Sequence, residues 1–541
     1  MRPQILDVSP EIEEKIAREI INYLHRHPNI SKNKITNIKG KIGKKYGHKK
    51  VIKNATVLKY AKDSEYEFLT NLLKRRITRT ISGVTIIAIM TKPLPCPGTC
   101  IYCPGPDSQP DDRVAQSYTG LEPAALRSIN SNYDPYLQVK SRINDLEAIG
   151  HSVDKIELIV MGGTFPATDI DYQTNFIKGA LEGVIDTHVP TLSETKALAE
   201  KASRALVGLT IETRPDYCTP NDIDRMLDYG TTRVEIGVQT VFNDIYELVN
   251  RGHTTKESIE AIRWAKDAGL KVNTHIMPNL PGSNYDKDMK LFNILFSDSN
   301  YRPDLLKIYP CLVVKGTELY DWWKNGKYEP YELNDLINLI ASTKKNLPPY
   351  VRIQRIMRDI PANLIEAGCK KSNLRQLVQE RLRETESECN CIRCREYGIS
   401  NRIDPIDEKI IDNAKLNRLD YEASKGTEVF LSFDSQKFLL GYLRLRKPSP
   451  KAHRIELNDG HTMIVREIKV VGELVPKGAK PRKKAQIQHR GFGKELMDAA
   501  EKISKEDFDA KKLAVISGLG VKRWFNKLGY DEDGPYVSKK I

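Results

Sequence analysis

Three cysteines in one short loop are the residues of this chain with the clearest chemistry. Cys96, Cys100 and Cys103 lie at C-x3-C-x2-C spacing, after the apolar run 84–90 and before a Pro-Gly-Pro segment. Three thiolates cannot alone close a four-coordinate structural zinc site, but they can hold three irons of a [4Fe–4S] cluster and leave the fourth iron open. The loop therefore predicts an iron–sulfur site. A zinc half-site with a distant fourth ligand and three unrelated buried thiols are the alternatives.

A second group of cysteines, Cys389, Cys391 and Cys394, has C-x-C-x2-C spacing and follows a charged segment, 373–386, that is predicted to be helical. No Gly/Pro-rich loop surrounds it, so a structural zinc ion at a domain junction is the favoured interpretation. Such a zinc ion needs a fourth ligand. Cys311 is the preferred candidate, ahead of His453, Cys369 and Cys218; a second iron–sulfur cluster and free thiols are the alternatives.

The elements that must position the first cysteine loop alternate between apolar strands and amphipathic helices. This alternation over about 250 residues predicts a parallel β/α barrel. Six strand–helix units would leave the barrel incomplete, and we assign residues 81–370 to this domain. The expected strands are 84–90, 156–161, 206–212, 234–238, 272–277 and 305–309, with helices such as 220–229, 256–268 and 285–296 between them.

Polar or glycine-rich motifs follow several of these strands. Gly162 and Gly163 end the second strand, Glu212 and Arg214 end the third, and a Glu-Ile-Gly-Val-Gln segment (235–239) ends the fourth. Chemistry in β/α barrels is located at the carboxyl ends of the strands. We therefore expect these residues to face the same opening as the cysteine loop, although any one of the motifs alone is also compatible with an ordinary turn.

The CxxxCxxC loop, the Gly-Gly turn and the Glu-Thr-Arg-Pro-Asp segment resemble those of radical S-adenosylmethionine enzymes. The resemblance implies that Cys96, Cys100 and Cys103 hold a [4Fe–4S] cluster whose open iron binds S-adenosylmethionine. It also implies that bound S-adenosylmethionine lies close to four further residues. These are Gly162, Gly163, Glu212 and Arg214.

The C-terminal region, residues 401–541, has a different pattern, with expected strands at 429–433, 438–445, 463–471 and 513–517. A Gln-x-x-Gly-x-Gly turn, Gln488 to Gly493, leads into a predicted helix, and backbone N–H groups at such a turn can hold a pyrophosphate. The turn resembles the acetyl-CoA loop of GNAT acetyltransferases. The resemblance implies a GNAT-like mixed α/β domain, joined to the barrel by a zinc-binding linker at 371–400.

The N-terminal region, residues 1–80, is predicted to be a small helical module with one basic face. Residues 31–62 contain eleven lysines and neither Asp nor Glu. Lysines at this density suit contacts with the phosphates of a nucleic acid. An ordinary solvated surface is the alternative. The candidate RNA-binding residues are Lys39, Lys41, Lys44, Lys45, Lys49 and Lys50.

The combination of these regions resembles the family of Elongator catalytic subunits and their archaeal homologues, in motifs that cover nearly the whole chain. The resemblance implies an enzyme that forms 5-carboxymethyluridine at the wobble position of tRNA from acetyl-CoA, using S-adenosylmethionine. It further implies that Lys155, on the second strand, is a catalytic residue that contacts acetyl-CoA. Other implied contacts are Glu467, Ile468, Lys469, Val470, Gln488, Gly491, Phe492 and Gly493, together with Trp524 and Phe525, which stand where the family has a tyrosine pair.

Composition is consistent with this interpretation. The 541-residue chain has a formal net charge of +14, which favours a polyanionic partner. No stretch of about 18 apolar residues is present, so we expect no membrane span and a cytoplasmic location. A protein lysine acetyltransferase with the cluster domain as scaffold is the rival hypothesis, and a homodimer is left open.

Overall fold

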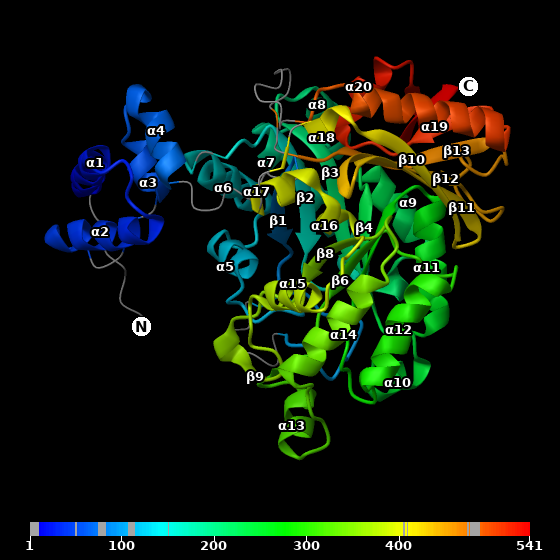
Figure 1. Ribbon diagram of the computed structural model, residues 1–541, viewed down its shortest axis with the longest axis horizontal. Coiled ribbons are helices and arrows are strands. Elements are labelled where there is room, and N and C mark those ends of the chain that lie inside the picture. The colour runs from blue at the N-terminus through cyan, green and yellow to red at the C-terminus, as the bar shows by residue number, and fades with distance from the viewer. Residues whose placement is uncertain are drawn as a thin grey trace.

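The computed structural model describes residues 10–48, 51–52, 54–73, 83–105, 114–149, 151–403, 406–407, 409–472, 475 and 487–541. Lys49 and Lys50 lie outside the described residues. Figure 1 shows a small helical module on one side of a large α/β body, with a second sheet packed over that body. None of the described helices has the length and apolar character needed to cross a membrane.

The N-terminal module is a bundle of four helices around its own core. Apolar side chains at helical spacing, including Ile16, Ile20 and Leu24, are fully buried in it. An ion pair of 2.7 Å between Arg18 and Glu65 joins the first helix to the last. The helices are α1 (Pro10–Arg26), α2 (Lys32–Lys45), α3 (Asn54–Lys59) and α4 (Asp63–Leu73), and α3 packs against α6 of the central domain.

The central domain contains a seven-stranded, wholly parallel sheet in the order β1-β2-β3-β4-β5-β6-β8. The predicted partial barrel is confirmed, with one strand more than expected. The strands are β1 (Thr85–Met90), β2 (Lys155–Met161), β3 (Ala205–Thr213), β4 (Arg233–Gln239), β5 (Lys271–Ile276), β6 (Leu305–Ile308) and β8 (Arg352–Ile356). The seventh strand was missed because its sequence, Arg-Ile-Gln-Arg-Ile, lacks the apolar run of the others.

Helices cover the outer face of this sheet and bury an apolar core against it. They are α5 (Pro123–Asn130), α6 (Pro135–Ala148), α7 (Ile170–Ile185), α8 (Leu192–Lys201), α9 (Pro220–Asp228), α10 (Asn243–Leu248), α11 (Thr255–Asp267), α12 (Tyr285–Ser297), α13 (Glu318–Lys324) and α14 (Leu333–Lys345). A short antiparallel pair, β7 (Val313–Val314) and β9 (Ile365–Ala367), closes the edge near α13. Thr, Asn or Asp side chains cap several of these helices; at α8, α9 and α11 a Thr forms a full capping box.

A chain of short helices leads to the C-terminal sheet. They are α15 (Leu374–Glu384), α16 (Ile392–Arg395), α17 (Tyr397–Ile403) and α18 (Lys409–Asp412). The sheet has the order β10-β11-β12-β13-β14-β16-β15 and is antiparallel except between β13 and β14. Its elements are β10 (Lys415–Ala423), β11 (Gly426–Ser435), β12 (Phe438–Lys447), β13 (Thr462–Val470), α19 (Phe492–Phe508), β14 (Lys512–Val515), α20 (Lys522–Asn526), β15 (Asp531–Asp533) and β16 (Tyr536–Lys540).

Buried charges join the two sheets. Arg466 on β13 contacts Asp304, just before β6, at 2.5 Å and Glu428 on β11 at 3.0 Å, and all three side chains are at most 1% exposed. Lys266 adds a second cation between the same two carboxylates, at 3.5 and 3.6 Å. Because each charge is paired, the network fixes how one sheet sits on the other, although burying it is not in itself a gain in stability.

Candidate active site

The cysteine loop opens into a cavity of about 360 Å³ at the carboxyl ends of the central strands. All three loop cysteines line it, together with residues that follow β2, β3 and β4. The structure therefore brings the predicted strand-end motifs together at one opening. The lining includes Cys96, Cys100, Cys103, Gly163, Glu212, Arg214 and Glu235.

Hydrogen-bond donors surround the sulfur atoms. Cys103 Sγ lies 3.1 Å from Ser117 Oγ and 3.3 Å from Gln116 Nε2, and Cys100 Sγ accepts from Arg251 Nη1 at 3.3 Å. Burial raises the pKa of Cys103 in the absence of a bound metal.

Arg214 gives an independent indication of an anionic occupant. Its Nε and Nη2 donate to Asp216 at 2.9 and 2.8 Å, but its buried Nη1 has no hydrogen-bond partner. A Cβ atom at Gly98 in the cysteine loop would lie 1.9 Å from this nitrogen, so a larger residue there would displace the guanidinium. An unsatisfied buried donor beside the cysteines fits a cluster or the carboxylate of a bound ligand.

The floor of the cavity is charged. Lys307 on β6 forms ion pairs with Glu212 at 3.3 Å and with Glu235, and His275 on β5 lies 2.9 Å from Glu235. Lys307 lowers the pKa of the buried Glu235 carboxyl well below its usual range, whereas burial lowers the pKa of His275. We did not predict Lys307 or His275. A charged residue inside an otherwise apolar strand was the available signal.

The Gly-Gly turn after β2 requires glycine on steric grounds. Gly162 and Gly163 have φ values of 117° and 82°, in the region that other residues rarely adopt. A Cβ at Gly162 would lie 2.3 Å from Thr91 Oγ1, which itself donates to the Gly162 carbonyl at 3.0 Å. Gly163 lines the cavity, whereas Gly162 holds the turn against β1.

A second candidate site lies at the opposite end of β2. Lys155, the first residue of that strand, donates to Gln488 Oε1 at 2.9 Å and lies 3.2 Å from His489 Nε2. Burial lowers the pKa of Lys155 to about 8. The central sheet thus contributes a cation to the predicted acetyl-CoA loop of the C-terminal domain.

The loop leads into α19 with the geometry of an anion site. Gly491 has φ of 101° and precedes the helix, whose first residues are Phe492 and Gly493. Trp524 packs beside Gly493, since a Cβ there would lie 3.7 Å from the indole. Phe525, by contrast, is 2% exposed and packs in the domain core, so the structure gives it a packing position rather than a binding one.

Strand β13 diverges from its neighbour next to this loop. Its parallel pairing with β14 covers only Thr462 to Val465, which leaves one edge of residues 467–470 without a strand partner among the described residues. The side chain of Glu467 is occupied, because it accepts from Arg444 at 2.9 Å and Tyr442 at 3.1 Å. Ile468 packs against the core, so the backbone of this segment is the part available to a ligand.

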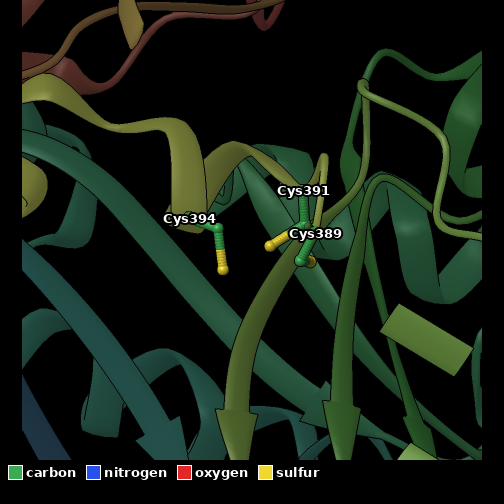
Figure 2. Close-up of side chains that lie close together, drawn as sticks. All are labelled: Cys389, Cys391 and Cys394. Atoms are coloured by element: carbon green, nitrogen blue, oxygen red, sulfur yellow. The ribbon is translucent and has the colours of Figure 1, made fainter. Parts of the chain in front are cut away.

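The second cysteine group forms a compact site, as Figure 2 shows. Ligand atoms of Cys389, Cys391 and Cys394 all lie within 4.8 Å of one another. Lys344 Nζ donates to Cys394 Sγ at 3.3 Å. Cys389 and Cys391 precede α16 and Cys394 lies within it, and Ile392 N of this helix donates to the carbonyl of Val351, the residue before β8.

Cys311 is not the fourth ligand, and that prediction was wrong. It lies beyond the carboxyl end of β6, where it packs with Ile101 and Tyr102 behind the first cysteine loop. The cysteine group lies at the other end of the sheet, where Ile392 N donates to Val351 O at 2.9 Å. The described residues add no fourth Cys, His, Asp or Glu to the group.

The lysines of the N-terminal module divide into two kinds. Lys39 is 4% exposed and donates to Asn54 at 2.5 Å inside the bundle, so its predicted role in RNA binding was wrong. Lys41 and Lys44 are exposed on α2. Lys45 is exposed as well but pairs with Glu19 at 2.9 Å.

Comparison with known proteins agrees with this geometry. The model of the radical SAM superfamily matches residues 95–294, and that of the radical SAM C-terminal domain matches residues 303–384. The partial barrel, the cysteine loop and the strand-end residues define a radical S-adenosylmethionine enzyme.

Full-length relatives identify the family. A protein of Methanocaldococcus jannaschii named tRNA uridine(34) acetyltransferase is 44% identical over 549 residues, which cover 99% of each chain. Elongator complex protein 3 of Saccharomyces cerevisiae is 41% identical over 93% of this chain and 91% of its own. The solved structure of Methanocaldococcus infernus Elp3, with residues 1–46 deleted, has 42% identity and a TM-score of 0.74 over 85% of this chain and 100% of its own. The chain belongs to the family of tRNA uridine(34) acetyltransferases and Elongator complex protein 3.

Proposed function

We propose that this enzyme forms 5-carboxymethyluridine at the wobble position of tRNA, with acetyl-CoA as the source of the carboxymethyl group. The contact of Lys155, on the central sheet, with Gln488, in the loop before α19, carries the proposal. This contact connects the sheet that carries the proposed cluster directly to the candidate acetyl-CoA site. The names of the relatives support tRNA uridine 34 as the target.

The residues of the first cavity fit a [4Fe–4S] cluster and S-adenosylmethionine. Cys96, Cys100 and Cys103 would hold the cluster, and the free Nη1 of Arg214 would donate to the anionic group beside it. When bound, this pair of cofactors supplies a 5′-deoxyadenosyl radical. The buried charges of Glu212 and Lys307 would orient polar groups of the ligand and keep bulk water out of the cavity.

The second site would bind acetyl-CoA. Backbone N–H groups from Gly491 onward would hold the pyrophosphate, and the unpaired edge of β13 would bind the rest of the carrier. Lys155, cationic below its pKa, would hold the carrier close to the start of β2 on the central sheet. Trp524 would pack against the carrier at the turn, where the family has a tyrosine.

Zinc at the second cysteine group is part of the same proposal. The compact arrangement of Cys389, Cys391 and Cys394 supports one tetrahedral ion rather than a cluster. A water molecule would complete the coordination. The ion would tie the linker to the start of β8.

One experiment tests the function directly. The reconstituted protein is incubated without oxygen with tRNA, acetyl-CoA and S-adenosylmethionine, and the tRNA is digested to nucleosides for mass spectrometry. We expect the mass of 5-carboxymethyluridine and its absence when Cys96→Ala is used. No change in uridine, with acetyl groups on protein lysines that survive Cys96→Ala, would contradict the proposal and favour a lysine acetyltransferase.

A further inference from the structure

Arg251 is a buried cation that has no carboxylate partner in the described part of the chain. It lies between α10 and α11 with 7% of its surface exposed. Its Nε donates to His253 Nε2 at 3.0 Å, its Nη2 to the carbonyl of Gly237, and its Nη1 to Cys100 Sγ at 3.3 Å. Burying a guanidinium without a counter-charge is costly, so this arrangement needs an anion.

The neighbours other than Cys100 cannot supply that anion. His253 Nε2 accepts a hydrogen bond from Arg251 Nε, so the ring hydrogen is on Nδ1, which donates to Thr254 O at 3.2 Å. Burial and the charge of Arg251 lower the pKa of His253 to about 4, which keeps the ring neutral. Gly237 offers a carbonyl dipole only. Cys100 Sγ, a thiolate when it binds the proposed cluster, is the remaining hydrogen-bond partner of Arg251.

Arg214, the other arginine beside the cysteine loop, makes the contrast clear. Its charge is already balanced by Asp216 at 2.8 Å, so the pair adds little net field at the loop. Arg251 adds a full positive charge that is directed at one ligand sulfur. Hydrogen bonds to sulfur and the local net charge are the main controls on the reduction potential of an iron–sulfur cluster.

We propose that Arg251 is a positioning residue that sets the reduction potential of the cluster by binding the Cys100 thiolate. The inference rests on the cluster in the proposed function. Adding an electron makes the cluster more negative, so a fixed cation in contact with a ligand sulfur stabilises the reduced form. Arg251 therefore makes the cluster easier to reduce. His253 keeps the guanidinium in place by accepting a hydrogen bond from its Nε.

The test is a potentiometric titration of the reconstituted enzyme, followed by electron paramagnetic resonance, without tRNA or acetyl-CoA. We expect Arg251→Gln to disfavour reduction at least tenfold, a shift of 59 mV to more negative potential for a one-electron couple. Arg251→Lys, which keeps the charge, should shift less. Arg263→Gln, an arginine on the adjacent α11 away from the cavity, is the matched control and should not shift.

A second measurement detects the contact directly in the wild-type protein and uses a variant only as its control. In wild-type protein labelled with ¹⁵N-arginine, the reduced cluster should show a weak ¹⁵N hyperfine coupling, which Arg251→Lys should abolish. An iron-replete Arg251→Gln with the wild-type potential, or a wild-type cluster without the coupling, overturns the inference. Wild-type protein that binds no cluster would instead contradict the proposed function.

Discussion

Lys155 gives the candidate acetyl-CoA site a pH dependence. Burial lowers its pKa to about 8 from a usual value of 10.5, so the folded protein loses this positive charge as pH rises through 8. We expect affinity for acetyl-CoA, measured by calorimetry from pH 6.5 to 9.5, to fall above pH 8. Lys155→Arg should remove the pH dependence, and Lys155→Met should weaken binding about 10- to 100-fold at pH 7, from ~1.5–3 kcal/mol for a charged hydrogen bond. Equal affinity of Lys155→Met and wild type would exclude the contact.

The cysteines of the first loop differ sharply from the buried structural ones. Cys96→Ala should remove most of the iron taken up during anaerobic reconstitution, together with the brown colour, because two thiolates hold a cluster poorly. Cys218→Ala is the control, since Cys218 is fully buried in the core of the central domain. Iron content and visible absorbance measure the difference. Unchanged iron in Cys96→Ala would rule out the loop as the cluster site.

Residues with distinctive spacing could be predicted from the sequence, and residues that act through the fold could not. The cysteine loop and the glycine turn have local signatures. Arg251 has none, and Lys307 has only its charge inside an apolar strand, because both reach the cavity from positions about 150 and about 200 residues further along the chain. Lys39 shows the reverse case. The lysine-rich composition of its segment suggested a surface role, but its side chain is buried inside the bundle.

At the scale of elements, the buried charges between the two sheets hold the sheets in a fixed relative position. Asp304→Asn removes a carboxylate that pairs with Arg466, Lys266 and Arg444. Glu428 and Glu467 are then left to balance the three buried cations. Breaking a buried pair in this way costs roughly 3–5 kcal/mol. We expect urea unfolding to shift to lower denaturant and to separate into two transitions. Asp420→Asn, which disturbs only the exposed pair with Arg418, should change stability by less than about 0.5 kcal/mol.

The second cysteine group is a further proposed connection between domains, and the identity of its metal can be tested separately. Cys391→Ser should remove bound zinc, measured by elemental analysis, and lower the thermal midpoint, because structural zinc adds directly to folding free energy. Cys369→Ser, outside the group, should keep the zinc. If wild-type protein holds iron here instead, the compact spacing has been misinterpreted.

Elements were predicted better than their edges and partners. In the central sheet the strands with apolar runs were found within one or two residues, but β8 was missed because Arg352 and Arg355 interrupt its apolar pattern. The wrong assignment of Cys311 has a related cause. Its place after a strand was correct, but the sequence does not show that β6 and β8 run parallel and so carry Cys311 and Cys391 to opposite ends of the sheet.

At the scale of the whole molecule, the N-terminal module presents exposed lysines on α2 and packs on the central domain through α3. Replacing Lys41 and Lys44 with alanine should weaken tRNA binding and lower the salt slope by about 2, roughly one per lost phosphate contact. Binding measured across salt concentrations tests this. The matched control is the double alanine variant of Lys502 and Lys505, exposed on α19. Equal slopes for the two double variants would exclude α2 as a phosphate-binding surface.

Lys155 and Gly163 lie at opposite ends of β2, so the length of this strand sets the distance that the proposed acyl carrier would have to span. A seven-residue strand spans about 20 Å. A carrier whose nucleotide is held at α19 must therefore use its flexible arm to span that length before its acetyl group can meet the radical chemistry. Selection thus depends on the length of the carrier as much as on its head group, and a thiol carrier with a shortened arm would occupy the nucleotide site without delivering its acetyl group.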